Sequence, residues 1–323
     1  MKKSKILIGA GGTGTSFAIV SQLRSTWPNL EIFVTDSNPK ELVTSSLFSD
    51  QFIQVPPVTD VLFESAIREI IREKDISVYQ PILNAEIALA FKLSLENEFT
   101  HVKFLINGYS ENFTDKKILG RWLNSHLFST PKNYELGQIA DIDGNFLIKP
   151  RDGSGSKGVE ILSGSQIREL SKDTLAQVLI EEVCEGPEIT VDSFHDFQSG
   201  TQFTYCRERL EVKSGVCVKA RIFFDEGIHA LAMRLARELG QNGTICFQLM
   251  QASGQTVITD LNFRSGAGTA MTVAAGFDVL SANFAVNTNH DYSRFVEPIG
   301  KNFNTIVTRQ YSEFVMSQSV ASL

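Results

Sequence analysis

The chain of 323 residues is longer than one typical hydrophobic core, so two or three packed units are expected. Its composition, 42% hydrophobic and 21% charged, is that of an ordinary globular protein. The net charge of −7 argues against a general nucleic-acid or anionic-membrane partner. No run approaches the roughly eighteen apolar residues of a membrane-spanning helix.

The cysteines and the N-terminus indicate a cytoplasmic protein. The four cysteines form no C-x-x-C pair, a pattern typical of reduced and mostly buried thiols. Lys2 and Lys3 precede the apolar run 6–8, but glycines follow at once, so this run is too short for a signal peptide.

The first hundred or so residues alternate strand and helix patterns. Strands are expected at 5–8, 31–36 and 78–83, and helices at 15–24, 60–73 and 86–95. Such alternation predicts a parallel sheet with helices on both faces.

The pattern changes from about Thr114, which is the expected cap of a helix running from Asp115 toward His126. Further strands are expected at 146–150, 159–162, 177–183, 188–194, 203–212, 216–223, 244–251 and 256–263. Helices are expected at 165–172 and at 226–239, the latter ending at Gly240. This part is predicted to be an α+β region built on antiparallel pairs, and 292–323 indicates no more than a closing helix.

A glycine loop, Gly9-Ala10-Gly11-Gly12-Thr13-Gly14, fits G-x-G-x-x-G between a strand and a helix. Asp36 ends the next strand, where a ribose-binding acid would lie. One interpretation is NAD or FAD binding. The other is a tight strand-to-helix turn without a dinucleotide, which a second nucleotide site downstream favours.

A second glycine loop follows Lys149, with the sequence Asp-Gly-Ser-Gly-Ser-Lys-Gly over 152–158. Between antiparallel strands, such a loop can close over a triphosphate with its N–H groups facing the oxygens. Lys149 can reach the same phosphates as a fixed cation. The alternative is a solvated hairpin tip, in which glycine and serine are common.

An acidic segment, Glu181 to Glu188, leads into an expected turn at Gly186-Pro187. Its extended peptide groups can pair with an adenine edge, and the Glu188 carboxylate can accept hydrogen bonds from ribose hydroxyls. An acidic surface hairpin is the alternative.

A polar set follows. Gln248 and Asp260 lie six residues either side of Gly254, and a hairpin centred there would place them opposite each other. Asn262 and Arg264 alternate onto the same face. Acid and amide oxygens suit Mg²⁺, and a guanidinium can neutralise a transferring phosphoryl group. The alternative is a polar solvent face.

These motifs resemble those of the ATP-grasp superfamily, in its carbamoyl-phosphate-synthetase-like branch. The stretch 146–159 resembles the lysine strand and phosphate-covering loop, and 181–192 the adenine hinge. The stretch 260–264, with Gln248, resembles the metal motif, although the usual form has glutamate and proline where Asp260 and Phe263 stand. Aspartate is shorter but keeps the carboxylate.

The resemblance implies an α/β N-terminal domain with a parallel sheet over 1–110. It implies an α+β ATP-grasp domain over 111–310, whose two subdomains clasp ATP, with the lid at about 130–183 and a tail at 311–323. It also implies that the N-terminal glycine loop belongs to a domain that has usually lost dinucleotide binding.

By the same resemblance, the activity is an ATP- and Mg²⁺-dependent (or Mn²⁺-dependent) ligase that activates a carboxylate as an acylphosphate for attack by an amine. Phosphates would be held by Lys116, Lys149 and the loop residues Gly153, Ser154, Gly155, Ser156 and Gly158. Adenine and ribose would be held by Glu181, Glu182, Cys184 and Glu188. Metals would bind Gln248, Asp260 and Asn262, and the catalytic cations would be Arg264, Lys219 and Arg209.

Two other functions stay open from the sequence. One is an NAD(P)-dependent oxidoreductase that uses the first glycine loop, and the other is an ATP-binding sensor or partner protein without turnover. The expected partners are a small-molecule carboxylate and an amine, with neither nucleic acid nor membrane, and a homodimer is the assembly to test.

Overall fold

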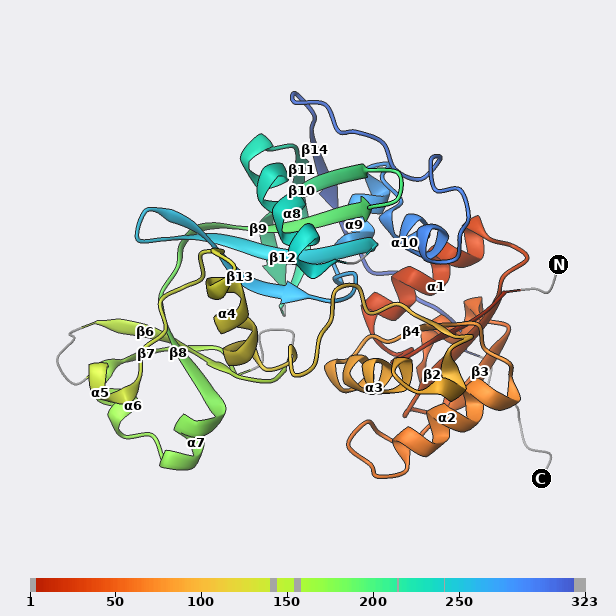
Figure 1. Ribbon diagram of the computed structural model, residues 1–323, viewed down its shortest axis with the longest axis horizontal. Helices are drawn as coiled ribbons and strands as arrows, with labels where there is room; N and C mark the ends of the chain where they lie inside the picture. Colours follow the sequence, from red (N-terminus) through yellow and green to blue (C-terminus); the bar gives the residue numbers. More distant parts are fainter. Residues whose placement is uncertain (1–3, 140–143, 154–157, 214, 241, 317–323) are drawn as a thin grey trace.

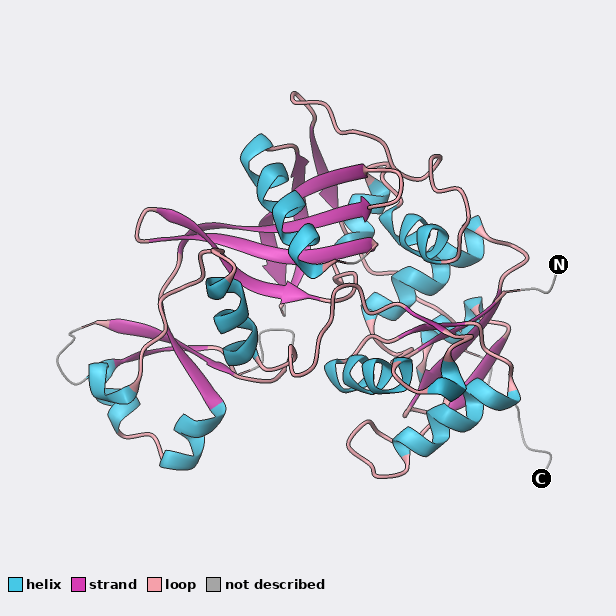
Figure 2. Cartoon of the chain, viewed as in Figure 1, coloured by secondary structure: helices cyan, strands magenta, loops and turns pink. Residues whose placement is uncertain are grey.

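The computed structural model describes residues 4–139, 144–153, 158–213, 215–240 and 242–316. Within them lie three sheets, one in each of three bodies (Figures 1 and 2). The N-terminal body and a small three-stranded body lie on opposite sides of the view, and the largest sheet lies above and between them. No helix in these residues is long and apolar enough to cross a membrane.

The N-terminal body is a parallel sheet of five strands in the order β3-β2-β1-β4-β5, which confirms the predicted fold class. Its strands are β1 (Lys5–Ile8), β2 (Glu31–Asp36), β3 (Gln51–Gln54), β4 (Val78–Gln80) and β5 (Lys103–Phe104). Its helices are α1 (Gly14–Thr26), α2 (Phe63–Glu73) and α3 (Asn84–Ser94), with short 3₁₀ turns η1 (Lys40–Leu42), η2 (Thr44–Phe48) and η3 (Asn97–Phe99).

Strand β1 explains why this sheet is covered on both faces. Ile6 and Ile8 pack into one core with Ile19 of α1, whereas Leu7 points to a second core with Ile67 of α2. All three β1 residues are fully buried. A continuous apolar run of this kind is what a parallel strand between two helix layers requires.

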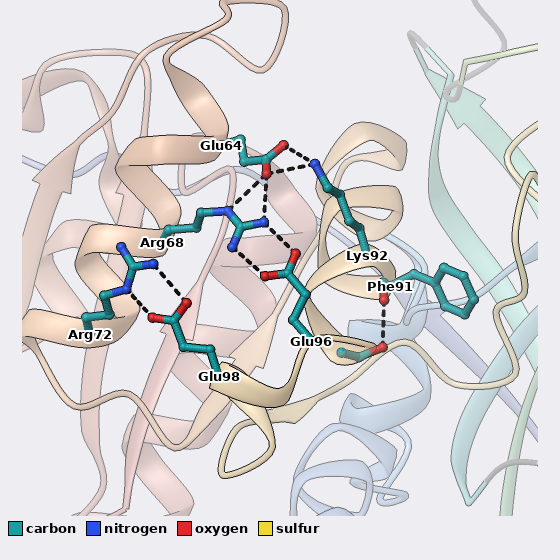
Figure 3. Close-up of polar contacts among 8 residues, drawn as sticks. Glu64, Arg68, Arg72, Phe91, Lys92, Glu96 and Glu98 are labelled. Atoms are coloured by element: carbon teal, nitrogen blue, oxygen red, sulfur yellow. Dashed lines mark hydrogen bonds and ion pairs between the residues drawn. The ribbon is translucent and has the colours of Figure 1, made fainter.

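A charged network ties α2 to α3 and η3 on the surface (Figure 3). Arg68 donates to Glu64 at 2.8 Å, one turn earlier in α2, and to Glu96 at 2.7 Å. Lys92 of α3 donates to the same Glu64 at 2.8 Å. Arg68 is therefore the centre of a two-sided carboxylate clamp.

Replacing Arg68 with methionine is expected to lower Tm by about 1–3 °C. A single ion pair near the surface contributes little to stability, but Arg68 joins several of them in one network, so its loss should be measurable. The loss should shrink in about 1 M NaCl, where screening is strong. Differential scanning calorimetry at two salt concentrations measures it, with methionine at the exposed Lys172 as the control. A salt-independent loss would contradict an electrostatic origin.

The small body is an antiparallel sheet in the order β7-β6-β8. Its strands are β6 (Asn145–Pro150), β7 (Glu160–Ser163) and β8 (Val178–Glu182), and its helices are α5 (Leu136–Ile139), α6 (Gly164–Arg168) and α7 (Lys172–Gln177). The single helix predicted over 165–172 is wrong. Ser163 caps α6 and Ser171 caps α7, so the second serine starts a new helix where one was expected to continue.

Helix α4 (Lys116–Ser125) begins one residue later than expected. Asp115, and not Thr114, is the N-cap residue, because its carboxylate accepts from the amides of Lys117 and Ile118 at 2.8 and 3.4 Å. Asp115 also pairs with Arg151 of the small body. The helix is thereby attached to the segment that leads into the second glycine loop.

The large sheet has the order β13-β12-β9-β10-β11-β14, with every neighbouring pair antiparallel. Its strands are β9 (Glu185–Asp196), β10 (Thr201–Lys213), β11 (Val216–Phe223), β12 (Gly243–Ala252), β13 (Gln255–Asn262) and β14 (Asn304–Thr308). The associated helices are α8 (Glu226–Leu239), α9 (Thr269–Ala274) and α10 (Val279–Asn287).

The predicted end of α8 and the predicted C-terminal helix have different outcomes. Gly240 ends α8 with a left-handed φ of 64°, as predicted. The closing helix expected in 292–323 is not found in the described part of that segment, which instead supplies β14 against β11. Residues 317–323 lie outside the described residues.

The large sheet is fixed to the N-terminal body through α10. Leu280 and Phe284 of α10 join the same core as β1 and α1. Asn107, after β5, donates to the carbonyl of Thr244 and to Asn283, both at 2.7 Å. These buried contacts set where the end of β13 meets the end of β4.

Candidate functional site

The hairpin β12–β13 brings Gln248 and Asp260 together. They are direct partners in the ladder and so share one face of the sheet. The hairpin turn consists of Ser253 and Gly254, with φ of 49° and 77°, and by itself would pair Gln248 with Thr259. A bulge between Gln248 and Leu249 shifts the register by one residue and leaves Thr259 outside the ladder.

Lys149 of β6 reaches from the small body to this bulge. Its ammonium lies 2.7 Å from the Glu181 carboxylate of β8 and 3.2 Å from the carbonyl oxygen of Thr259. Both side chains are buried, Lys149 at 9% and Glu181 at 4% exposure. Burial raises the pKa of Glu181, and the charge of Lys149 opposes that rise. The ion pair therefore lies within the small sheet, and the bond from Lys149 to Thr259 links it to the large sheet next to Asp260.

An open cleft of about 360 Å³ lies between the small body and the large sheet. It is lined by eight of the site residues predicted from the sequence: Lys116, Lys149, Gly153, Glu181, Cys184, Glu188, Gln248 and Asp260. These residues come from α4, both sheets and two connecting segments. The structure thus brings three separate motifs to one cavity.

The cleft also has apolar walls, which were not predicted from the sequence. They comprise Leu147, Val159 and Ile161 on the small body, with Val183 and Met250 opposite. Ile161 is 56% exposed and, together with Leu147 and Val159, forms an apolar patch in this wall. The available signal was the continuous apolar run in each of β6 and β7, which was interpreted only as strand formation.

Lys116 lies at the cleft entrance. Its ammonium donates to the carbonyl of Gly153 at 2.7 Å, and its amide donates to the carbonyl of Arg151 at 2.9 Å. Gly158 is exposed with a φ of 73°, and a Cβ there would lie 2.9 Å from the ring of Pro150. Ser154, Gly155 and Ser156, also predicted to hold phosphates, lie outside the described residues.

The acidic segment differs from the prediction in its local shape. The turn expected at Gly186-Pro187 is wrong, because β9 already starts at Glu185 and the linker is Val183-Cys184. Pairing of Glu185 with Gln251 of β12 draws the segment into the sheet.

Two acids of this segment have protein partners. The Glu182 side chain is not in the cleft lining. It accepts from the amide of Lys132 at 2.7 Å and from the hydroxyl of Ser253 at 2.9 Å. Glu188 is ion-paired with Arg209 on β10.

The two weaker catalytic candidates have separate settings. Arg209 touches the cleft only through Glu188, and it also donates to the carbonyl of Gly215 at 3.2 Å. Lys219 lies 2.6 Å from Glu211, is 54% exposed and is not in the cleft lining. Lys219 therefore stays a prediction that no contact with the cleft supports.

Asn262 is the last residue of β13, and Arg264 lies two residues beyond it. Asn262 donates to the Asp260 carboxylate at 3.0 Å and lines a small cavity with Lys116 and Asp260. Arg264 donates through Nε to the carbonyl of Ile82 at 2.6 Å, at the junction with the N-terminal body. Burial lowers the pKa of Arg264.

The predicted metal set fits a magnesium ion that shares its ligands with phosphates. Asp260 supplies a carboxylate, and Gln248 and Asn262 supply carboxamides from the same hairpin. Across the described ranges, no group of three or more His, Cys, Asp and Glu side chains could hold a metal by itself. Mg²⁺ in proteins commonly uses one or two carboxylates together with substrate phosphates, which matches this donor set.

The N-terminal glycine loop is filled by the protein's own carboxylates. The amide of Gly12 donates to Asp36 at 2.7 Å, and a Cβ on Gly9 would lie 2.2 Å from the Glu86 carboxylate. Asp36 accepts further bonds from the backbone and side chain of Asn38, both at 2.8 Å. This arrangement favours the tight-turn interpretation over dinucleotide binding.

Comparison with known proteins gives a match to one domain and a fold. Residues 113–268 match the family model of the ATP-grasp domain. No curated protein sequence matches the chain.

Solved structures resemble it over most of its length. The biotin carboxylase domain of 2-oxoglutarate carboxylase from Hydrogenobacter thermophilus, in complex with MgADP, ADP and bicarbonate, has a TM-score of 0.74 and 14% identity, covering 94% of this chain and 73% of its own. N5-carboxyaminoimidazole synthetase from Staphylococcus aureus, complexed with ADP, has a TM-score of 0.72 and 12% identity, covering 96% and 83%. Biotin carboxylase from Campylobacter jejuni has a TM-score of 0.72 and 13% identity, covering 94% and 74%. Residues 113–268 thus match the ATP-grasp domain, and the chain shares the fold of these solved structures.

Proposed function

We propose that this protein is an ATP- and Mg²⁺-dependent ligase that activates a carboxylate as an acylphosphate for attack by an amine. The observation that carries the proposal is the meeting of Lys149 and Glu181, from the small body, with Thr259 and Asp260 of the large sheet across one cleft. A cation, a hinge segment and a metal-binding carboxylate within one cavity are the parts that phosphoryl transfer from ATP needs.

The nucleotide end of the cleft has two kinds of surface. Leu147, Ile161 and Met250 offer apolar contact for a purine ring, and the Val183-Cys184 linker offers peptide groups for its edge. Glu188 would hold the ribose, although it would have to share its carboxylate with Arg209. Lys149 and Lys116, with the second glycine loop, would hold the phosphates.

The transfer end of the cleft lies at Asp260. Gln248, Asp260 and Asn262 would hold Mg²⁺, or Mn²⁺ in its place, which supplies positive charge to the bridging phosphate oxygens. A substrate carboxylate oxygen would attack the γ-phosphorus, and ADP would leave. The amine nitrogen would then attack the acyl carbon, forming the amide bond as phosphate leaves and the nitrogen loses a proton.

Arg264 would stabilise the negative charge that develops on the acylphosphate. Its guanidinium lies just beyond Asn262 at the junction between the large sheet and the N-terminal body. A substrate bound there would meet both bodies, which gives the N-terminal body a role in holding the acceptor. Arg209 and Lys219 are weaker candidates for a contact with the γ-phosphate or the substrate carboxylate.

The solved structures support this proposal. One of them holds MgADP together with bicarbonate, and others are synthetases with ADP. The expected partners are small-molecule acids and amines, and the free thiols suit a reducing cytoplasm. A homodimer is the expected assembly, because one of the solved structures is a biotin carboxylase domain dimer. Analytical ultracentrifugation measures this self-association.

MgATP is expected to raise Tm by several degrees at a hundred-fold excess over Kd, because binding then stabilises the folded state by about 2.7 kcal/mol. NADPH should leave Tm unchanged, since Asp36 and Glu86 fill the first glycine loop. ADP release should then appear in a panel of carboxylates with and without added amines. MgATP binding without ADP release from any acid would favour a sensor, and a shift with NADPH alone would favour the oxidoreductase.

A further inference from the structure

The Arg264 guanidinium is held by the N-terminal body and not only by its own domain. Its Nε donates to the carbonyl of Ile82 at 2.6 Å, while one terminal nitrogen donates to the carbonyl of Ser265 at 2.9 Å. Ile82 is 2% exposed and lies in the short segment 81–83 between β4 and α3. Any movement of this segment would therefore change where Arg264 points.

Segment 81–83 is fixed in turn by Glu86, in the first turn of α3. One carboxylate oxygen, Oε2, accepts hydrogen bonds from the amides of Ile82 and Leu83, both at 2.9 Å. Glu86 is 2% exposed, so these bonds form away from water and hold the segment firmly.

The other side of the Glu86 carboxylate lies against the first glycine loop. A Cβ built on Gly9 would be 2.2 Å from Oε1 and 2.6 Å from the carboxyl carbon. No real Cβ approaches that closely, so glycine at position 9 is what allows Glu86 to occupy this place. The loop that fits a dinucleotide pattern therefore contains a carboxylate of the protein itself.

We propose that Glu86 is a positioning residue for Arg264, acting through segment 81–83, and that the N-terminal glycine loop serves as the cradle of Glu86. This inference rests on the proposed function, in which Arg264 acts on the acylphosphate. Glu86 itself is not among the residues that line the cleft.

The kinetic test compares three variants with a matched control. Glu86→Ala and Gly9→Ala are expected to lower kcat for ADP release about 10- to 100-fold, since small misplacements of a catalytic group have effects of that size. KM for MgATP should stay within about 2-fold, because the nucleotide residues are elsewhere. Glu86→Gln keeps an acceptor oxygen for Ile82 and Leu83, so its kcat should be intermediate.

Gly14→Ala is the control within the same loop. A Cβ at Gly14 meets nothing within 4 Å, and the residue lies in the first turn of α1. Its kcat and KM should equal those of the wild type. A rise in KM with unchanged kcat in Gly9→Ala, or an equal loss in Gly14→Ala, would overturn the inference.

A spectroscopic readout is independent of turnover. The ¹⁵N-labelled Nε–H signal of Arg264, assigned by its loss in Arg264→Lys, should show slow hydrogen exchange in the wild type because of its bond to Ile82. Exchange should accelerate at least about 10-fold in Gly9→Ala and Glu86→Ala and stay unchanged in Gly14→Ala. An unchanged hydrogen exchange rate of the Arg264 Nε–H in folded Gly9→Ala would contradict the proposal.

The two proposals can fail separately. If no acid supports ADP release by the wild type, the proposed function fails, and the Arg264 signal still decides whether Glu86 holds the guanidinium. If Glu86→Ala does not fold, Glu86→Gln and Gly9→Ala give the answer.

Discussion

Replacing Lys149 with methionine is expected to weaken MgATP binding by about 100-fold or more, a loss of about 2.7 kcal/mol. Lys149 is the buried cation of the cleft, 2.7 Å from Glu181, and would pair with phosphate oxygens when ATP is bound. The substitution removes that charge and leaves the Glu181 carboxylate buried without its partner. Isothermal titration calorimetry with a non-hydrolysable ATP analogue and Mg²⁺ measures the change.

The same variant should lose stability as pH rises. Burial holds the pKa of Glu181 above its ordinary value of 4.5, and Lys149 is the largest influence that lowers it. Without Lys149 the folded-state pKa rises further, so the folded variant keeps a proton that the unfolded chain releases. The stability of the variant should be closest to that of the wild type below about pH 4.5. The deficit should grow once the pH exceeds the folded-state pKa of Glu181 in the wild type, and it should level off above the folded-state pKa of Glu181 in the variant.

Denaturant unfolding at a series of pH values measures this deficit. Lys117→Met is the control, because Lys117 pairs at 3.0 Å with Glu135, which is 76% exposed and keeps its hydration. Lys149→Met combined with Glu181→Gln should remove the pH dependence without restoring MgATP affinity. A deficit of equal size at every pH would show that the variant loses packing and not an ion pair.

The sequence predicted the parallel sheet well because its central strands are continuous apolar runs. Ile6, Leu7 and Ile8 are buried on both sides, which only a strand between helix layers explains. The edge strands β3 and β5 had no such signal. Gln51–Gln54 is half exposed, and Lys103–Phe104 has two residues, so both depend on pairing with a neighbouring strand distant in sequence.

Residues that favour a turn gave a wrong prediction where pairing between distant strands decides the structure. Gly186-Pro187 predicts a turn, but Glu185 pairs with Gln251, far along the chain, and the strand begins before the proline. The partnership of Gln248 with Asp260 was predicted correctly, although the turn has two residues and a bulge supplies the missing shift. Pattern alone could not reveal that bulge.

Eight of the residues that line the cleft were predicted from the sequence as site residues, but the contacts between them were not. Lys149 and Glu181 were identified separately, and only the pairing of β6 with β8 makes them a buried ion pair. The contact between Arg264 and Ile82 joins positions 182 apart in the sequence. Contacts of this kind depend on how the N-terminal body docks on the large sheet, which no local pattern encodes.

Replacing Asp260 with asparagine is expected to reduce Mg²⁺-dependent ADP release by at least about 1,000-fold, because loss of the metal removes several kcal/mol of charge stabilisation. Asp260 is the single carboxylate of the predicted donor set, and its partners Gln248 and Asn262 are neutral amides. Mn²⁺ binding in the presence of an ATP analogue, followed by electron paramagnetic resonance, should weaken in parallel. Asp173→Asn, at an exposed position of α7, should change neither quantity.

The pairing of β12 with β13 offers a way to restore the carboxylate that Asp260→Asn removes. Gln248 lies directly opposite Asp260 on the same face, so Gln248→Glu in the Asp260→Asn background places a carboxylate within the same donor set. Mn²⁺ affinity should then recover in part, and ADP release should recover less, because the longer side chain approaches the ion from the other strand. If Asp260→Asn alone kept both Mn²⁺ affinity and turnover, the ion would have to be held elsewhere, and the proposed geometry of transfer along β12 and β13 would be wrong.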